Sequence, residues 1–124
     1  MEGYKVTIRY ASLDNLSARE RIMLKDTSDC VSLDSATTEG EVTIKPEFNA
    51  VLDVHNEYTK DDKDYTQYII VDADGTKYIT GSDSFYSSLI DIADEMGDET
   101  FEIKVYRKPS KNYSGKDFIT CSII

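Results

Sequence analysis

The segment "YTQYIIVDADGTKYITG", residues 65–81, decides the fold, because it holds the clearest β-hairpin pattern in the chain. Two runs rich in β-branched and aromatic residues flank Asp74-Gly75, a pair that tolerates the positive φ angles of a tight turn. Tyr65 and Tyr68 are an odd number of positions apart, so they point to opposite faces of a regular strand. The segment therefore predicts two antiparallel strands, with only one of these tyrosines on any binding face.

The hydrophobic period changes after the hairpin from that of a strand to that of a helix, over residues 83–96. Ser82 supplies N-cap chemistry and Gly97 follows as a C-terminal stop. A strand is expected over residues 101–106 and a final strand over residues 118–124, since apolar residues alternate in the first and predominate in the second. The predicted helix presents four apolar side chains on one stripe: Phe85, Leu89, Ile92 and Met96.

The first half of the chain gives weaker signals. Alternation predicts a strand over residues 4–10, and Ser17 and Glu20 stand at capping-box spacing before a short helix over residues 18–25. The polar residues 26–41 are expected to form a loop, with at most a short strand near Val31 to Leu33.

Residues 41–58 are expected to form a strand that is interrupted at Pro46, because proline has no N–H to donate to a ladder. The resulting order predicts a mainly β, α+β fold with one long helix before the last two strands. This order fits a five-stranded barrel of the oligonucleotide-binding (OB) type, which commonly carries one helix between its third and fourth strands. Many other α+β folds also place a helix before a final hairpin.

Length and composition narrow the classes of protein to which this chain could belong. The 124 residues predict a single domain spanning residues 1–124, and no apolar run approaches membrane-spanning length, so a cytosolic protein is expected. Cys30 and Cys121 are interpreted as reduced, buried thiols. With a single histidine, no phosphate-binding glycine loop and no distinct carboxylate pair, the sequence predicts neither an enzyme nor a bound metal or cofactor.

Charge is the most informative property. The net charge is −10, yet residues 104–116, "KVYRKPSKNYSGK", hold five basic residues and no acid, which leaves −10 − 5 = −15 on the other 111 residues. Lysine and arginine side chains can contact the successive phosphates of a nucleic-acid backbone, and tyrosine rings can stack on its bases. We therefore predict that this basic segment contacts a nucleic-acid backbone, with Tyr68 and Tyr78 of the hairpin as further contacts. The candidates in the segment are Lys104, Tyr106, Arg107, Lys108, Lys111, Tyr113 and Lys116.

The second half of the chain resembles the single-stranded DNA-binding proteins of small tailed phages whose replication is primed by a terminal protein. The resemblance lies in the order of "VDADGTKYIT", "DSFYSSLIDIADEM", "ETFEIKVYR" and "SKNYSGKDFITCSII", over about residues 65–124. It implies an OB-like fold, sequence-tolerant binding of single strands, and protection of displaced strands during replication, with replication proteins as possible partners. The resemblance places Tyr106, Lys111 and Lys116 on matching stretches.

A second hypothesis comes from a different functional class. The acidic residues 61–64 and 91–99 could form the working surface of a phage-encoded inhibitor that imitates DNA with its carboxylates. Segregation of charge discriminates between the two, because such a mimic has no use for a purely basic patch facing its target.

Overall fold

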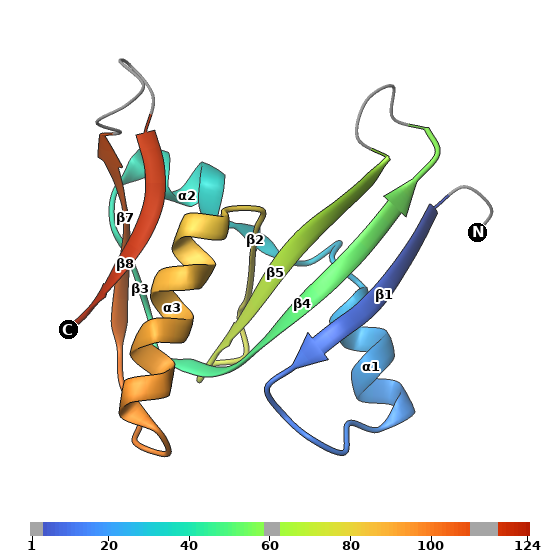
Figure 1. Ribbon diagram of the computed structural model, residues 1–124, viewed down its shortest axis with the longest axis horizontal. Helices are drawn as coiled ribbons and strands as arrows, with labels where there is room; N and C mark the ends of the chain where they lie inside the picture. The colour runs from blue at the N-terminus through green and yellow to red at the C-terminus, as the bar shows by residue number, and fades with distance from the viewer. Residues whose placement is uncertain (1–3, 59–62, 110–116) are drawn as a thin grey trace.

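Figure 1 shows a computed structural model of the chain, in which residues 4–58, 63–109 and 117–124 are described. These residues form eight strands and three helices. In chain order they are β1 (Tyr4–Ala11), α1 (Ala18–Lys25), β2 (Val31–Ser32), α2 (Leu33–Glu39), β3 (Val42–Ile44), β4 (Pro46–Asn56), β5 (Asp64–Asp72), β6 (Lys77–Thr80), α3 (Asp83–Met96), β7 (Ile103–Pro109) and β8 (Asp117–Ile123). No helix in this part of the chain is both long enough and apolar enough to cross a membrane.

The strands form one sheet of five, in the order β1-β4-β5-β6-β2, and one of three, in the order β3-β7-β8. All neighbours are antiparallel except β2 and β6. A single residue, Lys45, separates β3 from β4, so the chain passes directly from the small sheet to the large one. This confirms the predicted interruption at Pro46, where the β4–β5 register also shifts.

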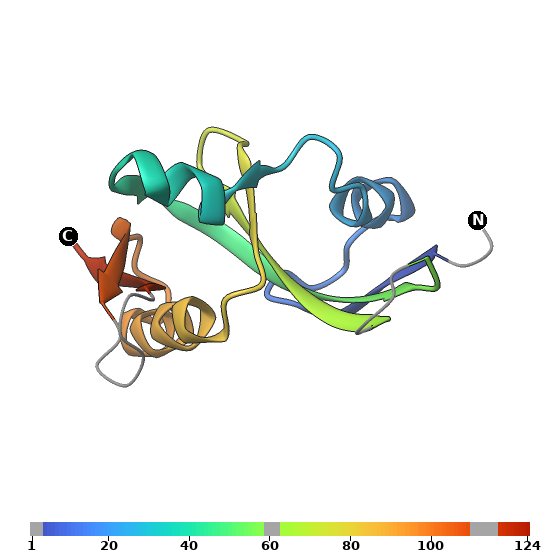
Figure 2. The ribbon, with the colours of Figure 1, turned by 90° about the horizontal axis from the view of Figure 1, so that it is seen from above.

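Two hydrophobic clusters lie on opposite faces of the large sheet. The inter-sheet cluster fills the space between the two sheets and α3; its buried members are Leu33, Ile44, Ile70, Phe85, Leu89, Ile103, Val105, Ile119 and Cys121. The α1 cluster lies beneath α1; its buried members are Leu24, Ala50, Leu52 and Ile69. Figure 2 shows α1 and α3 on opposite sides of the large sheet.

The hairpin and the long helix agree with the sequence analysis. β5 and β6 pair antiparallel, and of the Asp74-Gly75 pair only Gly75 adopts a positive φ angle, 91°. The α3 helix spans the predicted residues, with the Ser82 side chain accepting from the amide of Phe85 and Gly97 at the C-cap. Phe85 and Leu89 are buried, while Ile92 and Met96 are half-buried, so the predicted stripe is the packed face.

The prediction of one long helix was incomplete, because two shorter helices accompany α3. The α1 helix and its capping box were predicted, and the Ser17 and Glu20 side chains bond reciprocally to each other's backbone amides. The α2 helix was missed, because residues 26–41 were interpreted as a loop. This helix has no apolar stripe that would predict it from the sequence, because only Leu33 and Thr37 are buried. The Thr37 hydroxyl donates to the Leu33 carbonyl at 2.7 Å.

Strand β7 is longer than predicted. Residues 107–109 were assigned to the connection, but they continue the ladder, with Arg107 opposite Ile119 and Lys108 opposite Phe118. The predicted strand ends at Tyr106 because the alternation of apolar residues stops there, yet backbone pairing with β8 does not require apolar side chains. Residues 104–109 are therefore held on a regular strand.

The burial of the α3 stripe generates a test of the fold. Leu89 is 1% exposed in the inter-sheet cluster, so Leu89→Ala removes buried methyl groups and leaves a cavity. We expect the free energy of unfolding, measured by urea denaturation, to fall by about 2–5 kcal/mol. The matched control is Ser87→Ala on the exposed side of the same helix. Equal stability of the Leu89 variant and the control would contradict the packing described here.

Candidate nucleic-acid interface

The outward face of β7 carries a row of lysine, tyrosine and lysine. Ile103 and Val105 are fully buried, so the alternation of the strand directs Lys104, Tyr106 and Lys108 to the opposite side. Both lysines are exposed, and neither forms an ion pair with any described residue. We call these three residues the β7 row.

The ring of Tyr106 is held in place within the β7 row. Its hydroxyl lies 2.8 Å from the Ser122 Oγ of the neighbouring strand. The Lys104 Nζ lies 5.7 Å from the centroid of the same ring, within the range of a cation–π interaction. The half-buried ring is thus oriented before any ligand arrives, with a positive charge beside it.

Arg107 has a different environment from the β7 row. It points inward, where its Nε donates to the Thr37 Oγ1 at 3.1 Å and its Nη2 donates to the Asp34 carbonyl at 2.6 Å. Its guanidinium therefore anchors α2 to β7. Sequence reasoning grouped Arg107 with Lys108 by charge alone, and the strand separates the two onto opposite faces.

Three predicted contacts in the basic segment, Lys111, Tyr113 and Lys116, lie outside the described residues. They follow the β7 row directly in the sequence and remain predictions.

The two hairpin tyrosines lie in different environments. Tyr68 on β5 stacks on Tyr86 of α3, with ring centroids 4.2 Å apart and planes 10° apart. Tyr78 on β6 is half-buried and packs against the inter-sheet cluster, where burial raises the pKa of its hydroxyl. Both tyrosines are half-buried, and Tyr68 is stacked on a partner, Tyr86, that the sequence analysis did not select.

Hydrogen bonds fix both rings of this stacked pair. The Tyr68 hydroxyl donates to the Asp83 carboxylate and the Tyr86 hydroxyl donates to Asn49 Oδ1 at 2.8 Å. Partial burial, with the nearby Asp83 carboxylate as the second cause, raises the pKa of Tyr68 to about 12. Both phenols are therefore neutral near neutral pH, and the pair forms a rigid aromatic surface at the first turn of α3.

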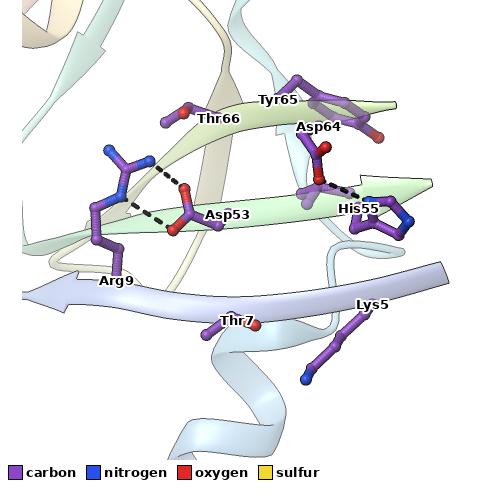
Figure 3. Close-up of a pocket in the computed structure, with 9 residues that line it drawn as sticks. Lys5, Thr7, Arg9, Asp53, His55, Asp64, Tyr65 and Thr66 are labelled. Carbon is purple, nitrogen blue, oxygen red and sulfur yellow. Dashed lines mark hydrogen bonds and ion pairs between the residues drawn. The ribbon is translucent and has the colours of Figure 1, made fainter. Parts of the chain in front are cut away.

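Beside Tyr68, the face of the large sheet that is turned away from α1 bears a polar hollow of about 430 Å³ across β1, β4 and β5. Figure 3 shows the Nε and Nη2 of Arg9 donating to the two carboxylate oxygens of Asp53. Lys5 extends from the same strand as Arg9. Sequence reasoning missed these cations as site candidates, although the alternation of Lys5, Thr7 and Arg9 in β1 already placed them on one face. No group of three or more metal-ligating side chains occurs within the described residues.

His55 lies between two carboxylates at the edge of this hollow. Its Nδ1 is 2.6 Å from Asp64 Oδ1 and its Nε2 is 2.6 Å from Glu57 Oε1. The hydrogen bond to Asp64, followed by that to Glu57, raises the pKa of His55 above its ordinary value. A raised pKa means that folding favours the charged imidazolium. Its contribution to stability is fully present below the pKa of the unfolded chain and is lost as the pH rises through the pKa of the folded chain.

The raised pKa of His55 can be measured directly, because the chain has a single histidine. We expect its imidazole ¹H NMR signal to titrate with a midpoint above the ordinary value of about 6.5, and Asp64→Asn to lower that midpoint. Asp74→Asn, in the β5–β6 turn, is the control and should leave it unchanged. A wild-type midpoint at or below the ordinary value would contradict the arrangement of His55 between the two acids.

Comparison with known proteins identifies the family to which this chain belongs. The family model described as phage single-stranded DNA-binding protein matches residues 21–124, which adds most of α1 together with β2, α2, β3 and β4 to the half of the chain that carries the quoted motifs. Neither the curated proteins nor the solved structures that were searched gave a match. The match covers most of the chain, which therefore belongs to the family of phage single-stranded DNA-binding proteins.

Proposed function

We propose that the chain coats displaced single strands without sequence preference during phage DNA replication, and that the β7 row is part of its contact surface. The β7 row is the observation that carries this proposal, since it combines two exposed lysines with an oriented ring between them. Cations can neutralise successive phosphates and a ring can stack on any base, so this combination tolerates every sequence. The proposed role is binding rather than catalysis.

The order and pairing of the strands, which can be arranged as an OB-like barrel, support the same proposed function. The continuous segment β3–β4 can be taken as the first barrel strand, followed by β5, β6, the helix α3, and then β7 and β8. Among the described residues no ladder joins β6 to β8, so the barrel would be open at that seam. There the Ser84 hydroxyl of α3 donates to the Ile119 carbonyl of β8 at 2.9 Å.

This assignment gives an expected path for the strand. OB-type barrels bind oligonucleotides on the face of their second and third strands and on the loops after the first and fourth strands. Here the first strand ends at Asn56, the fourth strand ends at Pro109, and the second strand is β5, which bears Tyr68. Figure 1 shows the N-terminal end of α3 and the ends of the β4–β5 and β7–β8 hairpins directed to the same side. We place the DNA across this side, from the β7 row past the Tyr68–Tyr86 pair.

The remaining parts of the proposal concern cellular context. We place the protein in the host cytoplasm, as one domain over residues 1–124, with proteins of the replication machinery as further partners. The family match supports the replication context. The acidic surface outside the contact region supports confinement of DNA to one side, because carboxylates repel phosphates.

Stacking on Tyr106 is tested by two substitutions at one position. Tyr106→Ala should weaken binding of a poly-dT oligonucleotide, measured by fluorescence titration, by about 1–3 kcal/mol, because the stacking ring is removed. Tyr106→Phe keeps the ring and removes only the bond to Ser122, so we expect most of the affinity to remain. Full affinity of the alanine variant would exclude Tyr106 as a stacking platform.

The phosphate contacts are tested by the dependence of affinity on salt. In the double variant Lys104→Ala and Lys108→Ala, the log–log salt slope should become shallower by about 0.7 for each phosphate that is no longer neutralised, equally for every base composition. The fold should be unaffected, because both lysines are exposed and neither is paired with a described acid. Arg107→Ala is the contrasting variant: it should lower the melting temperature, since it releases α2. An unchanged salt slope in the double variant would remove the β7 row from the interface.

A further inference from the structure

The outer surface of α1 combines apolar and basic side chains that nothing in the described structure covers. Ile22 and Met23 are 68% and 59% exposed, and Leu24 is the helix's one buried residue. Three exposed cations surround them, and none forms an ion pair with a described residue: Arg19, Arg21 and Lys25. Ile22 and Met23 form a small apolar patch rimmed by charged residues, an arrangement that is found at protein interaction sites.

Charge and shape on the outer face of α3 complement this surface. Asp91, Asp94 and Glu95 are charged residues on that side of the helix, and within the described residues they take part in no ion pair. A shallow hollow of about 310 Å³ lies there, lined by Ser87, Ser88, Ile90, Asp91 and Asp94. The half-buried Ile90 gives this hollow an apolar patch, with carboxylates around it that match the cations around Ile22.

The two surfaces cannot meet within one molecule. Figures 1 and 2 place α1 and α3 toward opposite ends of the longest dimension and on opposite sides of the large sheet. A contact between them must therefore join two copies, and since the two surfaces differ, it is of the head-to-tail kind, which gives an open filament unless its rotation closes a ring.

DNA fits the α1 surface less well than a second copy does. The helix lies on the face of the large sheet opposite Tyr68, and the C-terminal end of α1 is followed by Asp26 and Asp29, which repel phosphates. Its exposed apolar residues are aliphatic, whereas single-strand binding uses aromatic platforms.

We propose that the outer surface of α1 of one copy docks on the outer face of α3 of the next, with Ile22 entering the hollow beside Ile90. Repetition of this contact produces a linear array of copies. The contact does not involve the DNA surface, so it forms with or without a bound strand, and in its presence it makes binding of neighbouring copies cooperative.

Charge reversal tests this contact by sedimentation equilibrium of the full chain at low salt without DNA. The wild type should self-associate. The first variant reverses the charges on α1 through Arg19→Glu, Arg21→Glu and Lys25→Glu. The second variant reverses the charges on α3 through Asp91→Lys, Asp94→Lys and Glu95→Lys. Each alone should raise the dissociation constant of self-association by about tenfold or more, because like charges then face each other. An equimolar mixture should associate again, since each reversed surface finds its complement on the other variant.

Two further variants separate charge from apolar packing. Ile22→Gln, at a position too exposed to affect the fold, should also weaken association. Reversal of three acids outside both surfaces should leave it unchanged: Glu39→Lys, Glu41→Lys and Glu47→Lys. A wild type that stays monomeric at every concentration, or a mixture that fails to associate, would overturn the proposal. So would a loss of affinity of the α1 variant for an oligonucleotide of one site length, which would make α1 a phosphate contact instead.

Discussion

Strand β5 is buried on both of its faces at Ile69 and Ile70, and the rest of the structure depends on this constraint. Ile69 and Ile70 are adjacent and fully buried, and alternation sends one into the α1 cluster and the other into the inter-sheet cluster. The hairpin therefore cannot shift its register by one residue without exchanging the contents of both clusters. The α1 and α3 helices, the small sheet and the stacked Tyr68 all take their positions from this register.

The passage from β3 to β4 links that hairpin to the surface that bears the β7 row. The Lys45 amide donates to the Asp72 carboxylate at 3.2 Å, and the Ala73 amide donates to the Lys45 carbonyl at 2.9 Å. These bonds hold the turn of the β5–β6 hairpin against the point where the chain changes sheets. Because β3 then pairs with β7, the orientation of the β7 row relative to Tyr68 is determined by backbone hydrogen bonds rather than by long, exposed side chains.

Basic residues are scarce in this acidic chain, and the described ones serve different purposes. Arg107 anchors α2, and Lys77 anchors the end of α1 by donating to the Met23 and Asp26 carbonyls, both at 2.8 Å. Lys104 and Lys108 are paired with no described acid, and in our proposal this division, rather than net charge, gives a chain of charge −10 a surface that single-stranded DNA can approach. In the same proposal, the acids elsewhere favour one orientation of the DNA and provide the docking surface for the next copy.

The sequence by itself determined the elements whose signals are local. The hairpin at Asp74-Gly75, the bounds of α3 and the capping box of α1 all follow from neighbouring residues, and so do the alternation of the β7 row and the resemblance to phage single-stranded DNA-binding proteins. Tertiary structure decided what depends on distant partners. It made α2 a helix through the burial of Leu33, extended β7 by pairing with β8, and turned Arg107 inward while Lys108 stayed outside. It also paired Tyr68 with Tyr86, eighteen positions away in the sequence. Propensity and periodicity act over one or two turns of chain, whereas burial and pairing arise only when segments far apart meet, so the site could be predicted as a set of residue types but not as a surface.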